Sequence, residues 1–223
     1  MRAVVDVLQY LPMDIEELGI GPIKVFIDIG LVAHESLMGP ITYHGDIVTW
    51  CVTERCWHCN ANASSRSSSQ SPRPEPSQGS SLVIDVSGPS PSNTYSASDK
   101  IIFRSTRTLA KKHVEKSTWQ CTFVPNADCP HSFIRYVLIC YSANIASLEF
   151  MLLEKNCYYY TAVVIRLLEE VVGGEIQYGA KDVMGMNGRD KILAGEDVTE
   201  AVGKIREIYE TLYGDFMAVV SAL

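Results

Sequence analysis

Apolar residues alternate with polar ones near the N-terminus, which is the pattern of a half-buried β-strand. Residues 23–31 carry Ile, Val or Leu at every second position, directly after the turn Gly-Ile-Gly-Pro. Residues 47–53 are β-branched and aromatic and follow a turn at residues 43–46, so they predict a second strand. Upstream of both, residues 13–18 predict a single helical turn.

A second set of strand patterns lies further along the chain. Residues 101–105 and 119–124 are rich in β-branched and aromatic residues and predict one strand each. Between them, residues 109–116 predict a short basic helix. This part of the chain therefore adds strands to the same sheet as the N-terminal part.

The C-terminal half has the spacing of helices. Pro130 opens a helical pattern, as proline does at a first helical position. Residues 157–172 are apolar almost all round, which is typical of a buried helix, and Gly173-Gly174 ends it. Residues 198–220 repeat apolar side chains at three- and four-residue steps and predict an amphipathic helix that covers the core.

Residues 60–98 have a different composition from the rest of the chain. Fourteen of these 39 residues are Ser, and the segment holds five of the ten prolines. Such a composition buries too little apolar surface to offset its ordering entropy, so we predict a disordered insert. The apolar island at residues 82–86 is the one part of it that could add an edge strand. Residues 1–59 and 99–223 are then the β-rich and helix-rich halves of one domain.

The fold class that follows is α+β. We expect a small antiparallel sheet, built from both sides of the insert and packed on helices, with a buried helix that starts near Cys157.

Charge and composition exclude several classes of function. The net charge is −7, with 19 basic and 26 acidic residues, which argues against nucleic-acid binding. The most apolar long window, residues 133–153, contains charged residues and is too polar to span a membrane. Residues 1–13 lack the pattern of a secretory signal, so we expect an intracellular, cytoplasmic protein with free thiols.

Cys157 is the clearest chemical feature, because it begins the predicted buried helix. Unpaired backbone N–H groups and the helix dipole make that end of a helix positive, and this stabilises a thiolate. A nucleophilic cysteine also needs a base, usually histidine. All five histidines precede Cys157, so a catalytic pair must run His first and Cys second. They are His34, His44, His58, His113 and His131.

The segment around Cys157, Leu-Leu-Glu-Lys-Asn-Cys-Tyr-Tyr-Tyr, resembles the Asn-Cys-aromatic helix start of circularly permuted papain-like proteins. These are the NlpC/lecithin:retinol acyltransferase-like families, and within them the segment looks closest to fungal proteins with Cys-Tyr-aromatic at this place. About 25 residues carry the resemblance. It implies a thiol hydrolase or acyltransferase in which Asn156 and Cys157 match the motif and an early strand supplies the histidine.

The histidine half of that pattern differs in this chain. The family carries its histidine at the start of an early strand, whereas the strand predicted at residues 23–31 begins with Ile23. His34 follows the end of that strand, and His44 lies in the turn before the next one. We take His44 as the first candidate base and His34 as the second.

Two other hypotheses stay open. Cysteine is also a common small core residue, so our first interpretation is a degenerate, non-catalytic interaction module on the same fold, whose partner is an unknown protein, and the thiol hydrolase or acyltransferase is the alternative. Cys56-Trp-His-Cys59 has the spacing of half a zinc site, with Cys56, Cys59 and His58 as ligands, although a matching second pair is missing. Apart from that zinc alternative we expect no cofactor, and for an enzyme we expect an acyl or peptide substrate.

Overall fold

The computed structural model describes residues 17–28, 34–58, 83–85, 96–115, 117–129, 132–146, 157–178, 186–187, 190–191 and 195–221. For His34, Cys56, His58 and His113 the description covers the backbone alone.

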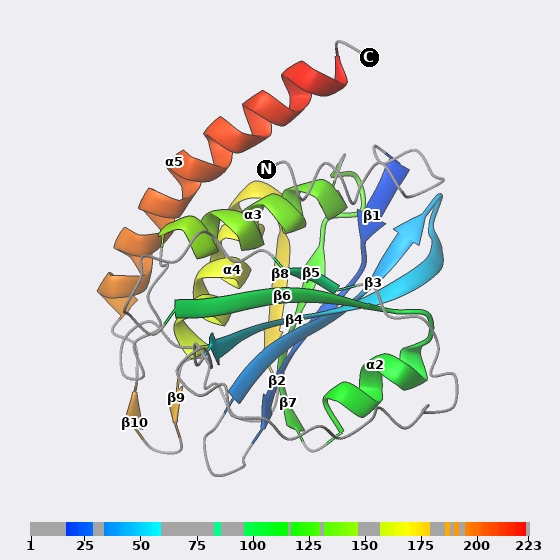
Figure 1. Ribbon diagram of the computed structural model, residues 1–223, viewed down its shortest axis with the longest axis vertical. Helices are drawn as coiled ribbons and strands as arrows, with labels where there is room; N and C mark the ends of the chain where they lie inside the picture. The colour runs from blue at the N-terminus through cyan, green and yellow to red at the C-terminus, as the bar shows by residue number, and fades with distance from the viewer. Residues whose placement is uncertain are drawn as a thin grey trace, which may run out of the picture.

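The described strands form one large antiparallel sheet and one small ribbon (Figure 1). The order in the sheet is β5-β6-β4-β3-β2-β7-β8, and β1 pairs with β3 in line with β2. The strands of the sheet are β1 (Leu18–Ile20), β2 (Ile23–Asp28), β3 (His34–Tyr43), β4 (Asp46–His58), β5 (Val83–Asp85), β6 (Ser96–Arg104), β7 (Ser117–Pro125) and β8 (Gly174–Tyr178). The ribbon pairs β9 (Met186–Asn187) with β10 (Asp190–Lys191).

A tight turn joins the two long central strands, β3 and β4. Its residues His44 and Gly45 both have positive φ, 50° and 87°, and Tyr43 pairs with Asp46 across it. Two central residues with positive φ match the right-handed twist of the flanking strands, which is why such turns close hairpins. The hairpin pairs from Tyr43–Asp46 at the turn to Ser36–Glu54.

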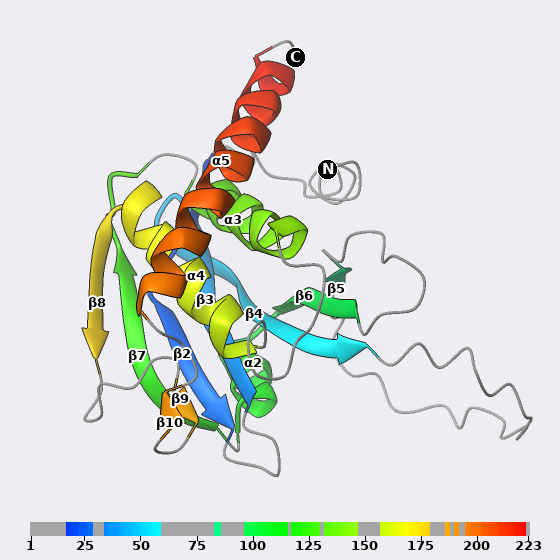
Figure 2. The same cartoon turned by 90° about the vertical axis from the view of Figure 1, so that its left-hand side faces the viewer.

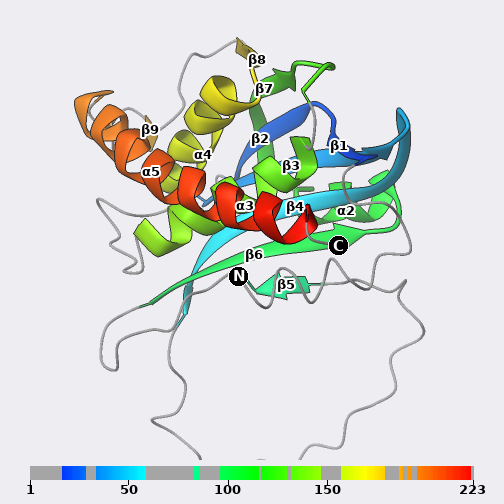
Figure 3. The same cartoon turned by 90° about the horizontal axis from the view of Figure 1, so that it is seen from above.

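Four helices flank the sheet in the described part of the chain. On one face lie α3 (Ser132–Ala146) and α4 (Cys157–Val171), and α5 (Gly195–Val220) contacts both of them (Figures 2 and 3). On the opposite face α2 (Arg107–His113) packs on β4 and β6. Figure 1 shows α5 running diagonally past α3, with its C-terminal turns extending beyond the sheet.

The main core lies between the sheet and α3 and α4. Helix α4 is buried on almost every side, as its sequence predicts; its most buried apolar residues are Val163, Val164, Ile165, Leu167 and Leu168. It ends where Gly173, with φ of 71°, takes the left-handed conformation that glycine adopts without strain. A smaller cluster on the other face joins Ala110 and Val114 to Met38 and Val52.

The α+β class is confirmed, and so are the antiparallel sheet and the helix that begins at Cys157. The strand at residues 34–43 was not predicted, because its polar residues and Pro40 hide the alternation. The apolar island of the Ser/Pro-rich segment does form a strand, β5, at the edge of the sheet. The helical turn expected at residues 13–18 is wrong at its last residue, since Leu18 begins β1. Residues 13–16 of that turn, and residues 60–82 and 86–95, lie outside the described residues.

None of the helices described combines the length and the hydrophobicity that crossing a bilayer requires.

A buried hydrogen bond links the sheet to α3 and gives a first prediction. The hydroxyls of Thr53 and Tyr136 lie 2.5 Å apart, and burial raises the pKa of Tyr136 well above its ordinary value, so the phenol stays protonated. We expect Tyr136→Phe to lower the free energy of unfolding by about 1–3 kcal/mol, because Thr53 loses this buried partner. Chemical denaturation measures the change, with Tyr178→Phe on the exposed strand β8 as a control expected to change little.

Candidate active site at the start of helix α4

Cys157 is the first residue of α4, which places its thiol at the positive end of a 15-residue helix. The side chain is 4% exposed and points to the sheet rather than to solvent. The next residue on the same helix face, Tyr160, is also buried. The first turn of α4 therefore lies against the end of a strand.

That strand is β3. The backbone N–H of Glu35 donates a hydrogen bond to the Sγ atom of Cys157, with 3.4 Å between the two atoms. Glu35 is the second residue of β3, and its nitrogen is bonded to the carbonyl carbon of His34. Given a peptide C–N bond of about 1.3 Å, the Sγ atom lies within roughly 5 Å of the His34 backbone. The structure thus places the backbone of His34, the first residue of β3, near the Cys157 thiol.

His44 occupies the other end of the same strand. It lies in the β3–β4 turn, where its Nδ1 atom is 3.6 Å from the Oε2 atom of Glu17 and both side chains are largely exposed. Nine residues separate it from Glu35, which is about 30 Å along an extended strand. The structure does not bring His44 to Cys157, and the strand order explains why: β3 runs from the cysteine toward the turn.

Two charged side chains lie fully buried next to Cys157. Glu35 and Arg55 are both 0% exposed, and they are the only buried acid and base among the residues with described side chains. The β3–β4 ladder pairs Ser36 with Glu54, so the next rung sets Glu35 opposite Arg55. The Arg55 guanidinium also lies 5.5 Å from the ring centre of Tyr160, three residues after Cys157.

This charged pair was not predicted from the sequence, because the strand that carries Glu35, β3, was not predicted. Once residues 34–43 are known as a strand, the alternation of side chains places Glu35 on the core face with Leu37 and Ile41. The sequence signal for the pair is a charged residue on the otherwise apolar face of a strand. An arginine guanidinium stays charged at any usable pH, so Arg55 in the core requires a negative charge close by.

Three of the four other cysteines with described side chains have a raised pKa. Burial raises the pKa of Cys51 to about 12. Burial, and then the charge of Glu35, raise the pKa of Cys121 to about 12. Burial also raises the pKa of Cys129. None of these three residues begins a helix, and all three are held as neutral thiols at pH 7.

The remaining candidate residues stay untested. The backbones of Cys56 and His58 belong to β4, while Cys59, the third proposed zinc ligand, is outside the described residues. Among the side chains that are described, no three His, Cys, Asp or Glu residues gather as a metal site would require. Asn156 and His131 also lie outside the described part.

Comparison of the chain with protein-family models, with curated proteins and with solved structures found no match.

Proposed function

We propose that this protein is a cysteine-dependent hydrolase or acyltransferase with a circularly permuted papain-like arrangement, in which Cys157 is the nucleophile and His34 the base. The observation that carries the proposal is the hydrogen bond from the Glu35 amide to the Cys157 sulfur, because it sets the residue after His34 against the thiol. The chain order, histidine on an early strand and cysteine at a later helix start, is the order that the Asn-Cys-aromatic resemblance implies.

The chemistry needs only groups that this arrangement supplies. His34 would take the thiol proton, and the Cys157 sulfur would attack an acyl carbonyl carbon, forming a C–S bond. The first backbone N–H groups of α4 have no partner within the helix, so they suit an oxyanion at that carbonyl. The histidine would then return the proton to the leaving amine or alcohol. Water or a second acceptor would release the acyl group from sulfur.

One observation favours a second candidate, the non-catalytic interaction module. Cys157 is only 4% exposed, as is usual for a core thiol, whereas a nucleophile must meet its substrate. The two functions predict different thiol chemistry, so a single experiment separates them.

The test is acylation by a small activated ester. The full chain is mixed with p-nitrophenyl acetate near neutral pH, and the release of nitrophenolate is followed with time. We expect a burst of about one equivalent per chain, as a covalent acyl-enzyme produces. Mass spectrometry of digested protein should place the acetyl group on Cys157.

Two variants make this result specific. Cys157→Ala should abolish the burst, while Cys129→Ala, which removes a more exposed thiol whose pKa is raised, should leave it unchanged. Absence of a burst from the folded wild-type chain, or acetyl groups spread over several thiols, would overturn the enzyme and favour the interaction module.

A further inference from the structure

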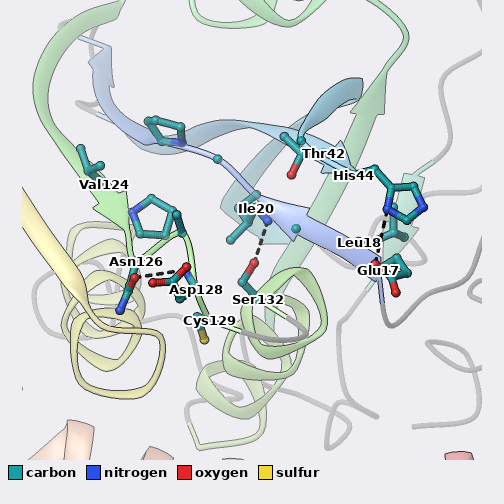
Figure 4. Close-up of a pocket in the computed structure, with 16 residues that line it drawn as sticks. Glu17, Leu18, Ile20, Thr42, His44, Val124, Asn126, Asp128, Cys129 and Ser132 are labelled. Atoms are coloured by element: carbon teal, nitrogen blue, oxygen red, sulfur yellow. Dashed lines mark hydrogen bonds and ion pairs between the residues drawn. The ribbon is translucent and has the colours of Figure 1, made fainter.

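An open groove of about 460 Å³ lies at the far end of the sheet from Cys157, between β1, the β3–β4 turn and the loop from β7 to α3. In Figure 4, Glu17 and His44 stand at one end of this groove and Asn126 and Asp128 at the other, with Ile20 and Ser132 between them. We propose that this groove binds an extended peptide segment with basic side chains, which adds as a strand to the edge of β1 that pairs with no other described strand.

Two prolines create the groove. Strands β2 and β7 pair up to the rung Ile23–Phe123, and the next two rungs would set Pro22 opposite Val124 and Gly21 opposite Pro125. Proline has no N–H to donate, so the ladder between these two segments cannot continue. Beyond that point β7 pairs only with β8, and β1 pairs only with β3, among the residues described. The groove occupies the gap that is left between them.

On the edge of β1 that faces this gap, the N–H of Ile20 is already bonded to a side chain of α3, so a peptide would pair with the backbone of Leu18 or take the place of the Ser132 hydroxyl. The N–H of Gly21 donates to Pro40 of β3, whereas the N–H of Ile20 points the other way and donates to the Ser132 hydroxyl at 3.0 Å. Because backbone groups alternate along a strand, those of Leu18 point to the groove as well. The side chains of Leu18 and Ile20 are buried in the core, so these two residues line the groove with backbone. Strand edges of this kind bind extended peptides.

The negative charge of the groove favours a peptide with basic side chains. Glu17 and Asp128 are exposed acids near the two ends of the groove, and its described lining contains no Lys or Arg. A five-residue extended peptide spans about 13 Å between its first and last residues, and these two side chains leave the strand on the same face. Basic residues at both ends of such a peptide would carry the charge opposite to that of these two carboxylates.

The groove and the thiol are separate sites. His44 lines the groove and Cys157 contacts Glu35, at opposite ends of β3, about 30 Å apart. Peptide binding in the groove therefore needs no catalysis by Cys157. The two proposals can fail independently, and Cys157→Ala should bind the peptide as wild type does.

The test uses a capped, fluorescently labelled pentapeptide of valine and threonine with arginine at each end. Its binding to the full chain is measured by fluorescence anisotropy up to about 1 mM protein. We expect weak saturable binding, at least tenfold tighter than that of the same peptide with glutamate at each end. A version with N-methylated backbone amides should lose at least tenfold in affinity, because it cannot pair with β1.

Matched variants locate the site. Glu17→Gln and Asp128→Asn should each weaken the arginine peptide by about threefold, the effect of one exposed ion pair, while Glu175→Gln on β8 should not. The peptide should also slow alkylation of Cys129, which lines the groove. Equal binding of the two charge versions, insensitivity to N-methylation, or no binding by the folded full chain would each overturn the proposal. The last result would point to a groove filled by another segment of the chain itself.

Discussion

Replacing His34 with alanine is expected to slow acylation of Cys157 by about 10²–10⁴-fold, because the thiol loses the base that takes its proton. The measurement is the rate of the nitrophenolate burst near neutral pH. The expectation rests on the place of His34 at the start of β3, one residue before the amide that contacts the Cys157 sulfur. The loss should be smaller at high pH, where hydroxide removes the thiol proton in place of the histidine.

The chain offers a matched control for this experiment. His44 follows the last residue of the same strand and lies in the exposed turn at its other end, so His44→Ala should change the burst rate less than about twofold. A thermal melt of each variant shows whether the fold is kept. If His44→Ala slows acylation and a folded His34→Ala does not, the assignment of His34 is wrong.

Replacing Glu35 with alanine is expected to lower the free energy of unfolding by about 3–5 kcal/mol, since it leaves the charge of Arg55 in the core without a compensating acid. Both side chains are fully buried and face each other across the β3–β4 ladder. The measurement is denaturation of the purified variant by urea. A loss of this size is a large share of the stability of an ordinary domain, so reduced yield of the variant is expected as well.

A double variant tests whether the two charges compensate each other. Glu35→Met combined with Arg55→Met removes both, and buried ion pairs replaced by apolar residues are often neutral or stabilising. We expect the double variant to be more stable than Glu35→Met alone by at least about 2 kcal/mol. Additive effects of the two substitutions would show that Arg55 does not depend on Glu35.

Much of the fold was predictable because it depends on the local pattern of apolar and polar residues. The helix at residues 157–171 is apolar on every side and ends at two glycines, and neither property depends on distant residues. The strand at residues 23–28 shows the alternation of a sheet with one buried face, and the strand at residues 117–125 is rich in β-branched and aromatic residues. Strand β3 was not predicted because the polar residues Glu35 and Ser36 interrupt the alternation of apolar side chains. Both are buried, and only the packing of the fold buries them.

The site was predictable only on its cysteine side. The position of Cys157 at a helix start follows from the local sequence, whereas the choice of histidine depends on which end of β3 meets α4. His34 begins β3 and His44 directly follows its last residue, ten positions later, and the local sequence pattern does not distinguish them. The register of the sheet does, because it sets the Glu35 amide 3.4 Å from the Cys157 sulfur.

By itself, the sequence determined the α+β class, the buried helix and the thiol at its positive end, since these depend on periodicity and on residues close in the chain. The tertiary structure decided which strand end lies next to the thiol and which charges share the core. It also decided where two prolines leave a strand edge unpaired. These features join residues that are 20 to 123 positions apart, as Glu35 is from Arg55 and His34 from Cys157. Only the packing of α4 on the sheet and the strand register bring them together.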